Sequence, residues 1–381
     1  MQDVEVIQTE PLEKRLDEPA GIASWLATTL GRVLVSLIVP LVTFLVLWQG
    51  FIFLRNSAAP QIVLVLVAII WGVGGVALLF LVTNWLVEQM PSVWTRRLQP
   101  FVFVGPGVAI LSWYLAVPTI RTLILSFQND ISTQFTGLDN FLFAFTDRIM
   151  LEAFRNNLLW MIFGTLFCVG LGLLISVLAD RSRFESIYKA IIFMPMAISF
   201  VGAGVIWKFV YTYKGTGAGI EETGLLNAIV IALGGQSQPW LLQPPWNNFF
   251  LIVIMVWLQT GFSMVVISSA IKGIPAELLE AARVDGATEV QAFFNITIPY
   301  IQGTLITVTT TVVIFSLKLF DVVRVMTGGN NGTNVIANEF YIQRFTYGHA
   351  GRASAIAIVL LVAVIPVMIY NLRQFRESRA F

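Results

Sequence analysis

Long runs of apolar residues recur along this chain, and they restrict its fold more than any other feature. Apolar residues make up 57% of the 381 residues and charged residues only 12%, which excludes an ordinary soluble globule. A helix needs about 20 mostly apolar residues to cross about 30 Å of hydrocarbon, and several runs reach that length. The sequence therefore predicts an all-α integral membrane protein.

Eight segments are long and apolar enough to form transmembrane helices. We expect them over residues 33–54, 62–87, 101–127, 158–179, 190–211, 249–271, 300–320 and 353–370. A polar connector at 88–99 follows the second span. It divides the chain into residues 1–98, with two spans, and residues 99–381, with six. The segments 128–157 and 327–351 are expected to be loops, and the second is rich in glycine and asparagine, which favour irregular structure.

The distribution of basic residues predicts the orientation of these spans, because Lys and Arg accumulate on the cytoplasmic side. Thirteen of the 23 Lys and Arg residues fall on one side. They are Lys14, Arg15, Arg32, Arg96, Arg97, Arg181, Arg183, Lys189, Lys272, Arg283, Arg373, Arg376 and Arg379. Both termini lie on that side and are expected in the cytoplasm. Residues 1–20 are acidic, unlike a secretory signal, and are expected to form a solvated tail.

Several kinds of chemistry are excluded. A net charge of +1 argues against nucleic acid as a partner. A single cysteine and a single histidine cannot form an internal disulfide or a Cys/His zinc site, and we expect no metal, no cofactor and no catalytic residues. No GxxxxGK[ST] phosphate loop occurs. If nucleotide energy drives this protein, a partner must bind the nucleotide.

A polar segment interrupts the apolar pattern between the sixth and seventh spans. Pro275 ends the sixth span, and a short helix is expected over 276–284 with acidic residues near its start. Gly286 permits a tight turn, a second helix follows from about residue 287, and Pro299 precedes the next span. We call residues 272–299 the elbow. These features alone fit either a surface loop with helical propensity or a docking element at the membrane face.

The elbow resembles the EAA loop of binding-protein-dependent ABC importers. That signature is Glu-Ala-Ala, three residues, Gly, nine residues, Ile, one residue and Leu-Pro. The matching residues are in register, and Ile298 replaces the usual leucine. They are Glu280, Ala281, Ala282, Gly286, Ile296 and Pro299. The resemblance implies that the elbow fits a cleft on an ATPase subunit and that Glu280 pairs there with a basic residue.

The resemblance extends over about residues 101–381. Met194-Pro195, Trp207 and Thr327-Gly328-Gly329 look like the carbohydrate-uptake subfamily, which includes the large maltose permease subunit. This implies a six-helix permease core preceded by two extra N-terminal helices. The large outer domain of the maltose subunit is missing, because 128–157 is short. The implied partners are a second permease subunit, two ATP-binding cassette subunits that hold the ATP, and a periplasmic or lipid-anchored solute-binding protein.

Polar and aromatic residues within the sixth and seventh spans are candidates for contacts with the solute. Gln259 and Phe262, and Phe315 and Ser316, align with positions of the sugar site of the maltose relative. Amides and aromatic rings suit a sugar. Alternatively, these residues bond or pack between helices. Three charged residues spaced three apart either form an ion-pair cluster or line the pathway: Lys318, Asp321 and Arg324.

The resemblance thus implies a non-enzymatic subunit of an ATP-driven importer in the bacterial inner membrane. The implied solutes are sugars or glycosides: an oligosaccharide, a disaccharide or a glycosylated osmolyte such as glucosylglycerol. The alternative is an ion-coupled secondary solute carrier. Such a carrier is expected to have carboxylates at membrane depth, and the predicted spans contain none well inside them.

Overall fold

A computed structural model describes residues 22–90, 92–215 and 224–377, and nearly all of them are helical. The tail expected at residues 1–20 lies outside these ranges. The chain divides into two compact units, one ending at Val117 and the other beginning at Pro118. The division predicted after residue 98 rests on composition and on the resemblance, and it stays a prediction.

Unit 1 consists of three long helices. They are α1 (Ile22–Asn56), α2 (Gln61–Glu88) and α3 (Ser92–Leu111), followed by a π-helical turn (Ser112–Ala116). The indole nitrogen of Trp71 in α2 donates to the carbonyl of Leu47 in α1 at 3.1 Å. The rings of Phe80 and Phe103 join α2 to α3 with centroids 4.9 Å apart. Unit 1 is therefore held together by pairwise contacts between successive helices.

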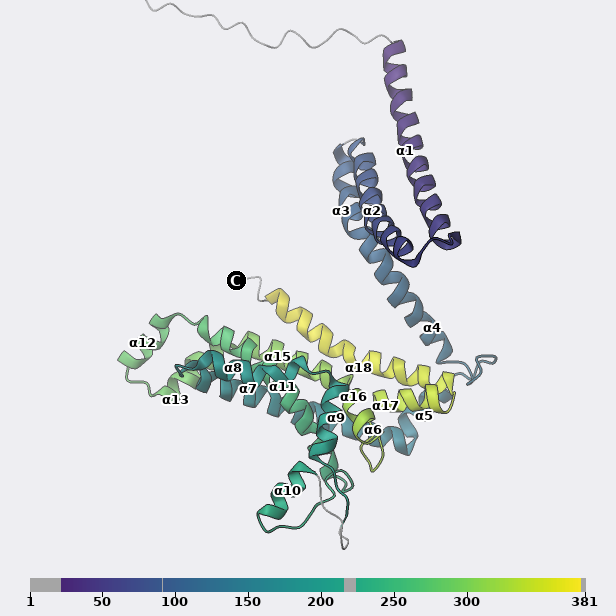
Figure 1. The fold of residues 1–381 in the computed structure, drawn as a ribbon. Coiled ribbons are helices and arrows are strands. Elements are labelled where there is room, and N and C mark those ends of the chain that lie inside the picture. The colour runs from purple at the N-terminus through teal and green to yellow at the C-terminus, as the bar shows by residue number, and fades with distance from the viewer. Residues whose placement is uncertain (1–21, 91, 216–223, 378–381) are drawn as a thin grey trace, which may run out of the picture. The chain divides into compact units, whose positions relative to one another are not determined.

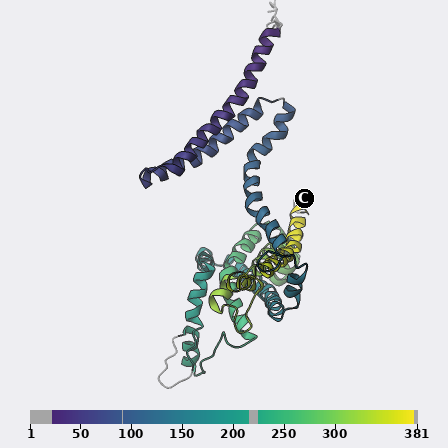
Figure 2. The same cartoon turned by 90° about the vertical axis from the view of Figure 1, so that its right-hand side faces the viewer.

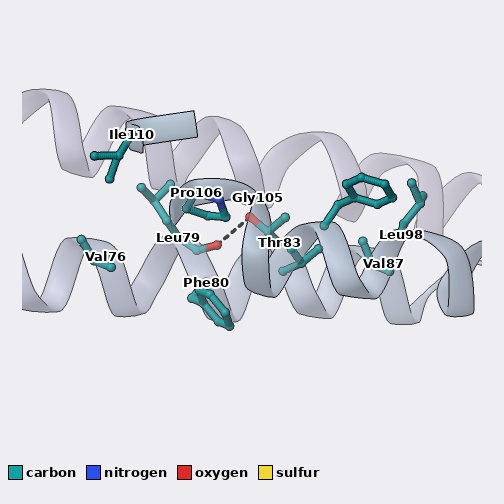
Figure 3. Close-up of a pocket in the computed structure, with 11 residues that line it drawn as sticks. Val76, Leu79, Phe80, Thr83, Val87, Leu98, Gly105, Pro106 and Ile110 are labelled. Atoms are coloured by element: carbon teal, nitrogen blue, oxygen red, sulfur yellow. Dashed lines mark hydrogen bonds between the residues drawn. The ribbon is translucent and has the colours of Figure 1, made fainter. Parts of the chain in front are cut away.

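A pocket of about 520 Å³ lies between α2 and α3 (Figure 3). Apart from Thr83 its labelled lining is apolar, with Leu79, Phe80 and Pro106 among the residues that face it. The Thr83 hydroxyl donates to the Leu79 carbonyl of its own helix at 2.6 Å. This apolar surface is what helices in contact with lipid tails present.

Unit 2 contains all the elements of the elbow and of the candidate substrate site. Its helices are α4 (Val117–Leu125, which begins at the last residue of unit 1), α5 (Asp139–Thr146), α6 (Arg148–Leu159), α7 (Thr165–Asp180), α8 (Glu185–Phe193), α9 (Phe200–Val210), α10 (Leu225–Ala232), α11 (Trp246–Lys272), α12 (Ala276–Val284), α13 (Glu289–Ala292), α14 (Ile298–Tyr300), α15 (Gln302–Leu317), α16 (Asp321–Met326), α17 (Ile336–Tyr341) and α18 (Ala350–Glu377). Short π-helical turns follow α6, α13 and α17 at Trp160–Gly164, Phe293–Thr297 and Ile342–Thr346, and a 3-10 turn follows α8 at Met194–Ala197.

Within unit 2, different helices lie at the two ends of the helix bundle. Helices α12 and α13 lie at one end of the bundle of α7, α8, α11 and α15, whereas α5, α6 and α17 lie toward the other (Figure 1). Helices α9 and α10 project from this bundle in both views (Figures 1 and 2). The elbow is therefore separated from α5, α6 and α17 by the length of the bundle.

The structure confirms the all-α membrane fold. Among the residues that the structure describes, six helical segments are long and apolar enough to cross a membrane: Leu34–Asn56, Gln61–Glu88, Ser92–Leu125, Arg148–Asp180, Trp246–Lys272 and Ala350–Asn371. Two further candidates are bent pairs, Glu185–Ala197 with Phe200–Val210 and Glu289–Tyr300 with Gln302–Leu317. Each pair counted as one span gives the eight that the sequence predicts.

The span expected over 190–211 is not one straight helix. Its two halves meet at 101°. Pro195 lies in the 3-10 turn between them, where its missing N–H removes a helical hydrogen bond. Ser199 then starts a new helix, because its hydroxyl accepts the N–H of Gly202 at 3.0 Å.

Both outer segments expected to be loops contain helices, so this prediction was wrong. Residues 128–157 hold α5 and most of α6, and 327–351 hold α17 and its π-helical turn. Side-chain amides fix these segments: Asn140 donates to the carbonyls of Ser126 and Gln128 at 3.0 and 2.7 Å. Such long-range side-chain contacts override local loop composition.

Close packing of α7 on α11 forms the centre of unit 2. A Cβ atom on Gly172 would lie 2.6 Å from the Ser263 Cβ and 2.9 Å from the Met264 nitrogen. A Cβ atom on Gly261 would lie 2.6 Å from the carbonyl oxygen of Ile192, at the end of α8. Glycine at these two positions thus allows α7 and α8 to approach the backbone of α11, as is usual between membrane helices.

We predict that Gly172→Ala destabilises the protein by about 1–3 kcal/mol, because the new methyl group would overlap α11. Gly170→Ala is the matched control on the same helix, where a Cβ would meet no atom within 4 Å. It should leave stability unchanged or raise it by up to about 1 kcal/mol. Thermal unfolding of the purified proteins in detergent measures both, and equal midpoints would contradict the close approach.

Candidate functional site

The first half of the elbow is a two-and-a-half-turn helix that presents its acidic side to water. Helix α12 spans Ala276–Val284, the range expected from the sequence, and Pro275 precedes it. Glu280 and Ala281 are exposed, whereas Ala282 is 8% exposed. The glutamate of the signature is therefore free to meet a partner, and one alanine packs toward the protein.

A glycine turn ends this helix. Gly286 has a φ of +82°, a conformation that costs little only for glycine. Its N–H donates to the Arg283 carbonyl at 3.1 Å, and the N–H of Ala287 donates to the Ala282 carbonyl at 2.9 Å. These two bonds form a Schellman cap, so the turn predicted at Gly286 is present and its carbonyls are satisfied.

The second half of the elbow starts at a capping box. The hydroxyl of Thr288 accepts the N–H of Gln291, and the Thr288 N–H donates to the Gln291 side chain at 2.8 Å. Ile296 is half-buried in the π-helical turn, and Pro299 is exposed in α14. The chain then bends by 69° before α15 begins at Gln302. The elbow is thus a helix–turn–helix unit joined to both spans through breaks.

Charged side chains connect the elbow to the end of α7. A carboxylate oxygen of Glu289, the first residue of α13, lies 2.9 Å from the guanidinium of Arg181, and the other lies 3.2 Å from that of Arg283. These groups border a pocket of about 430 Å³ between the elbow, α7 and α11. Apolar side chains, including Val177, Ile271 and Phe293, supply the rest of its wall.

A second charged cluster joins α7, α8 and α11 beside this pocket. The ammonium group of Lys189 lies 2.5 Å from carboxylate oxygens of both Asp180 and Glu185. Lys272 lies 2.5 Å from Glu185, and the Ser268 hydroxyl donates to Asp180 at 2.7 Å. Lys189 and Asp180 are only 17% and 11% exposed, so water screens their attraction less than at an open surface.

The four candidate substrate residues occupy two neighbouring helices, α11 and α15. Gln259 is 8% exposed, and Phe262 and Phe315 are half-buried. Ser316 is fully buried, and its hydroxyl donates to the Val312 carbonyl at 2.9 Å. In this conformation the serine bonds its own helix, and its role toward a solute stays a prediction, as do those of the other three.

Aromatic residues that the sequence did not single out for the solute lie beside them. The ring of Phe200 in α9 packs on Phe315, with centroids 4.8 Å apart. A separate chain of ring contacts runs through α9 and α11 to the segment between α10 and α11, each with centroids 5.1 to 5.8 Å apart. It comprises Trp257, Trp207, Tyr211, Phe250 and Trp240. Their sequence signal was weak, because isolated aromatic residues are common in apolar helices.

The charged trio near the outer end of the seventh span does not form the ion-pair cluster considered from its spacing. Within the described ranges no ion pair joins Lys318, Asp321 and Arg324. Lys318 caps the end of α15 and Asp321 starts α16, so the three do not share one helix face. The Arg324 guanidinium instead lies over the ring of Tyr341, 4.4 Å from its centroid.

A buried amide network holds the outer segment 327–349 to the bundle. Asn156 donates to the carbonyls of Gly332 and Asn334, both at 2.8 Å. Asn334 and Gln343 each donate to one oxygen of Glu339 at 2.7 Å, and Glu339 is 2% exposed. The sequence pattern did not identify this carboxylate, because it lies outside the predicted spans. Within the described ranges no three His, Cys, Asp or Glu residues could hold a metal ion.

The fold and the elbow together define a helical permease with a helix–turn–helix insert between two spans. Residues 168–379 match the family described as "Binding-protein-dependent transport system inner membrane component". This match includes the elbow and covers more than half of the chain. The chain belongs to this family, and it is a membrane-spanning component of an ABC transporter in the inner membrane.

Two curated relatives are similar over most of this sequence. The osmoprotective compounds uptake permease protein GgtC of Synechocystis sp. is 56% identical over 277 residues, which are 73% of this chain and 99% of the relative. The alpha-glucoside transport system permease protein AglF of Rhizobium meliloti is 45% identical over 285 residues, 74% of this chain and 84% of the relative. Each alignment leaves about a quarter of this chain uncovered.

A solved structure shows the same fold. A chain of a bacterial alginate ABC transporter, crystallised with an alginate pentasaccharide-bound periplasmic protein, superimposes with a TM-score of 0.64. The superposition covers 74% of this chain and 96% of that one, at 21% sequence identity. The importer-permease fold predicted from the elbow is therefore confirmed.

We predict that Lys189→Met destabilises the protein by about 1–3 kcal/mol, because Asp180 and Glu185 lose the cation that both contact. Lys272→Met is the matched control, since this lysine contacts the same Glu185 but is 52% exposed. Its loss should cost less than about 1 kcal/mol. Unfolding of both variants in detergent tests the difference, and a larger effect for Lys272→Met would show that the cluster is assigned wrongly.

Proposed function

We propose that this chain is the translocating subunit of an ATP-driven importer and that its elbow receives the force of ATP binding from an ATPase subunit. The observation that carries this proposal is the elbow itself: the EAA signature lies on an exposed helix–turn–helix between two spans. Glu280 is the contact residue, Gly286 makes the turn, and Ala281, Ala282, Ile296 and Pro299 shape the rest. Spans must satisfy their backbone internally, so this polar unit belongs in water, where a partner reaches it.

The complete machine requires partners that this chain does not supply. Two ATP-binding cassette subunits bind and hydrolyse the ATP, so the chain itself is not an enzyme and holds no cofactor. A second permease subunit provides the other elbow, and a periplasmic or lipid-anchored solute-binding protein delivers the solute. Both termini and the elbow lie in the cytoplasm, in agreement with the side on which basic residues accumulate.

The solute is a small sugar or glycoside, and a glycosylated osmolyte such as glucosylglycerol or an α-glucoside is the first to test. The names of the two relatives, one for osmoprotective compounds and one for alpha-glucosides, support this choice. The site combines the amide of Gln259 with the rings of Phe262 and Phe315, and the Ser316 hydroxyl becomes available if its side chain rotates away from the Val312 carbonyl. Aromatic faces and a few hydrogen-bonding groups are what a sugar site needs.

Binding of ATP and of the loaded binding protein shifts the permease between inward and outward access. Each ligand shifts this equilibrium only by its differential affinity for the two states. The breaks on either side of the elbow, at Gly273–Pro275 and at Ile301, allow it to move relative to the spans. The elbow converts the closure of the ATPase subunits into rearrangement of α11 and α15.

Reconstitution into liposomes tests this function. We expect radiolabelled glucosylglycerol to accumulate only when the ATPase subunits, the second permease, the binding protein and ATP are all present, because this chain has no phosphate loop. Sucrose and trehalose, assayed in parallel, measure the selectivity. Accumulation driven by a proton or sodium gradient, in liposomes that hold this chain alone, would instead establish an ion-coupled carrier.

A further inference from the structure

The last residue of α7 and the one that follows it point into two different charged clusters. Asp180 contacts Lys189 of α8 and accepts from Ser268 of α11. Arg181 contacts Glu289 of the elbow, 108 residues away in the sequence. One backbone segment thus connects the elbow to both helices that flank α7.

Glu289 occupies the central position on the elbow side. One of its oxygens contacts Arg181 of the bundle, and the other contacts Arg283 of α12. The carboxylate therefore connects both helices of the elbow to α7 at once. Its position is fixed by the capping box at Thr288, which sets the first turn of α13.

The Arg181–Glu289 contact lies at the rim of the pocket between the elbow, α7 and α11. Apolar side chains of the elbow, α7 and α11 line its volume of about 430 Å³, and Leu279 of α12 packs against the hydrophobic core of unit 2. At the pocket this apolar packing is interrupted, and the Arg181–Glu289 pair bridges the rim. When the elbow moves toward or away from α7 across the pocket, the force acts on the Arg181–Glu289 pair.

We propose that Arg181 and Glu289 are positioning residues that transmit movement of the elbow to α7, from which Asp180 passes it to α8 and α11. This inference rests on the proposed function of the elbow. The two side chains of the pair are 65% and 54% exposed in the isolated chain, where water and salt screen them. A docked ATPase subunit that covers the elbow removes this water and strengthens the pair, so docking itself engages the connection.

A double-mutant cycle in the reconstituted complex tests the proposal. The variants are Arg181→Gln, Glu289→Gln and the two combined. The readout is the ratio of ATP hydrolysis with and without a saturating amount of the co-purified binding protein, which requires no knowledge of the solute. Each single variant should lower this ratio by at least about fivefold, the low end of coupling between distant sites. The double variant should lose no more than Glu289→Gln alone, because that change already removes the contact with Arg181.

Three further variants separate transmission from other roles. Arg183→Gln is the matched control, since the Arg183 guanidinium lies over the ring of Phe184 at 4.7 Å, and it should keep the wild-type ratio. Arg181→Lys keeps the charge and should restore most of the stimulation. Glu280→Lys should instead prevent co-purification of the ATPase, whereas Arg181→Gln and Glu289→Gln should retain it.

Several results would overturn the proposal. The first is a hydrolysis ratio for Arg181→Gln within about twofold of that of the wild type. The second is a double variant in which the losses of the two single variants multiply. The third is loss of the ATPase from the Arg181→Gln complex, which would assign the pair to docking. A wild-type complex that does not hydrolyse ATP or does not bind an ATPase would refute the proposed function itself. The two failures are therefore distinguishable.

Discussion

The close contact between α7 and α11 is the interaction on which the rest of unit 2 depends. It requires glycine at Gly172, because any Cβ there would overlap the backbone of α11. Helix α11 carries Gln259 and Phe262 in the middle of the bundle and leads directly into the elbow at its end. Helix α7 ends at the two charged clusters. A shift of α7 against α11 therefore changes the candidate substrate site and the elbow end of the bundle together.

Membrane solvation explains where the polar groups of this chain are placed. Hydrocarbon offers no hydrogen bonds, so buried polar groups must find partners within the protein. At the end far from the elbow the amides of Asn156 and Asn334 satisfy backbone carbonyls and the Glu339 carboxylate. At the elbow end the carboxylates of Asp180 and Glu185 surround Lys189. Between these ends the hydroxyls of Thr260, Thr310 and Ser316 donate to carbonyls of their own helices, and Gln259 is the amide candidate for a solute.

The sequence predicts the parts of this structure that depend on local chemistry. Hydropathy locates the spans, and proline, acidic residues and glycine locate α12 and the turn at Gly286, because these effects act within a few residues. Helix α17 and the pair Arg181–Glu289 could not be predicted, because each depends on contacts between segments far apart in the sequence. The bend before Ser199 has a local cause, Pro195 and the Ser199 cap, which the hydropathy pattern did not reveal. The candidate substrate residues came from a resemblance, and the structure adds Phe200 beside Phe315.

The central claim is that the elbow lies in the cytoplasm and contacts an ATPase subunit. A cysteine in place of Val284 tests it most directly, because this side chain is 87% exposed at the tip of α12 and the natural Cys168 is fully buried. A membrane-impermeant maleimide should label Val284→Cys in inside-out vesicles and not in right-side-out ones, and bound ATPase subunits should block the reaction. Labelling from the outside, or labelling that the ATPase subunits do not change, would contradict the account.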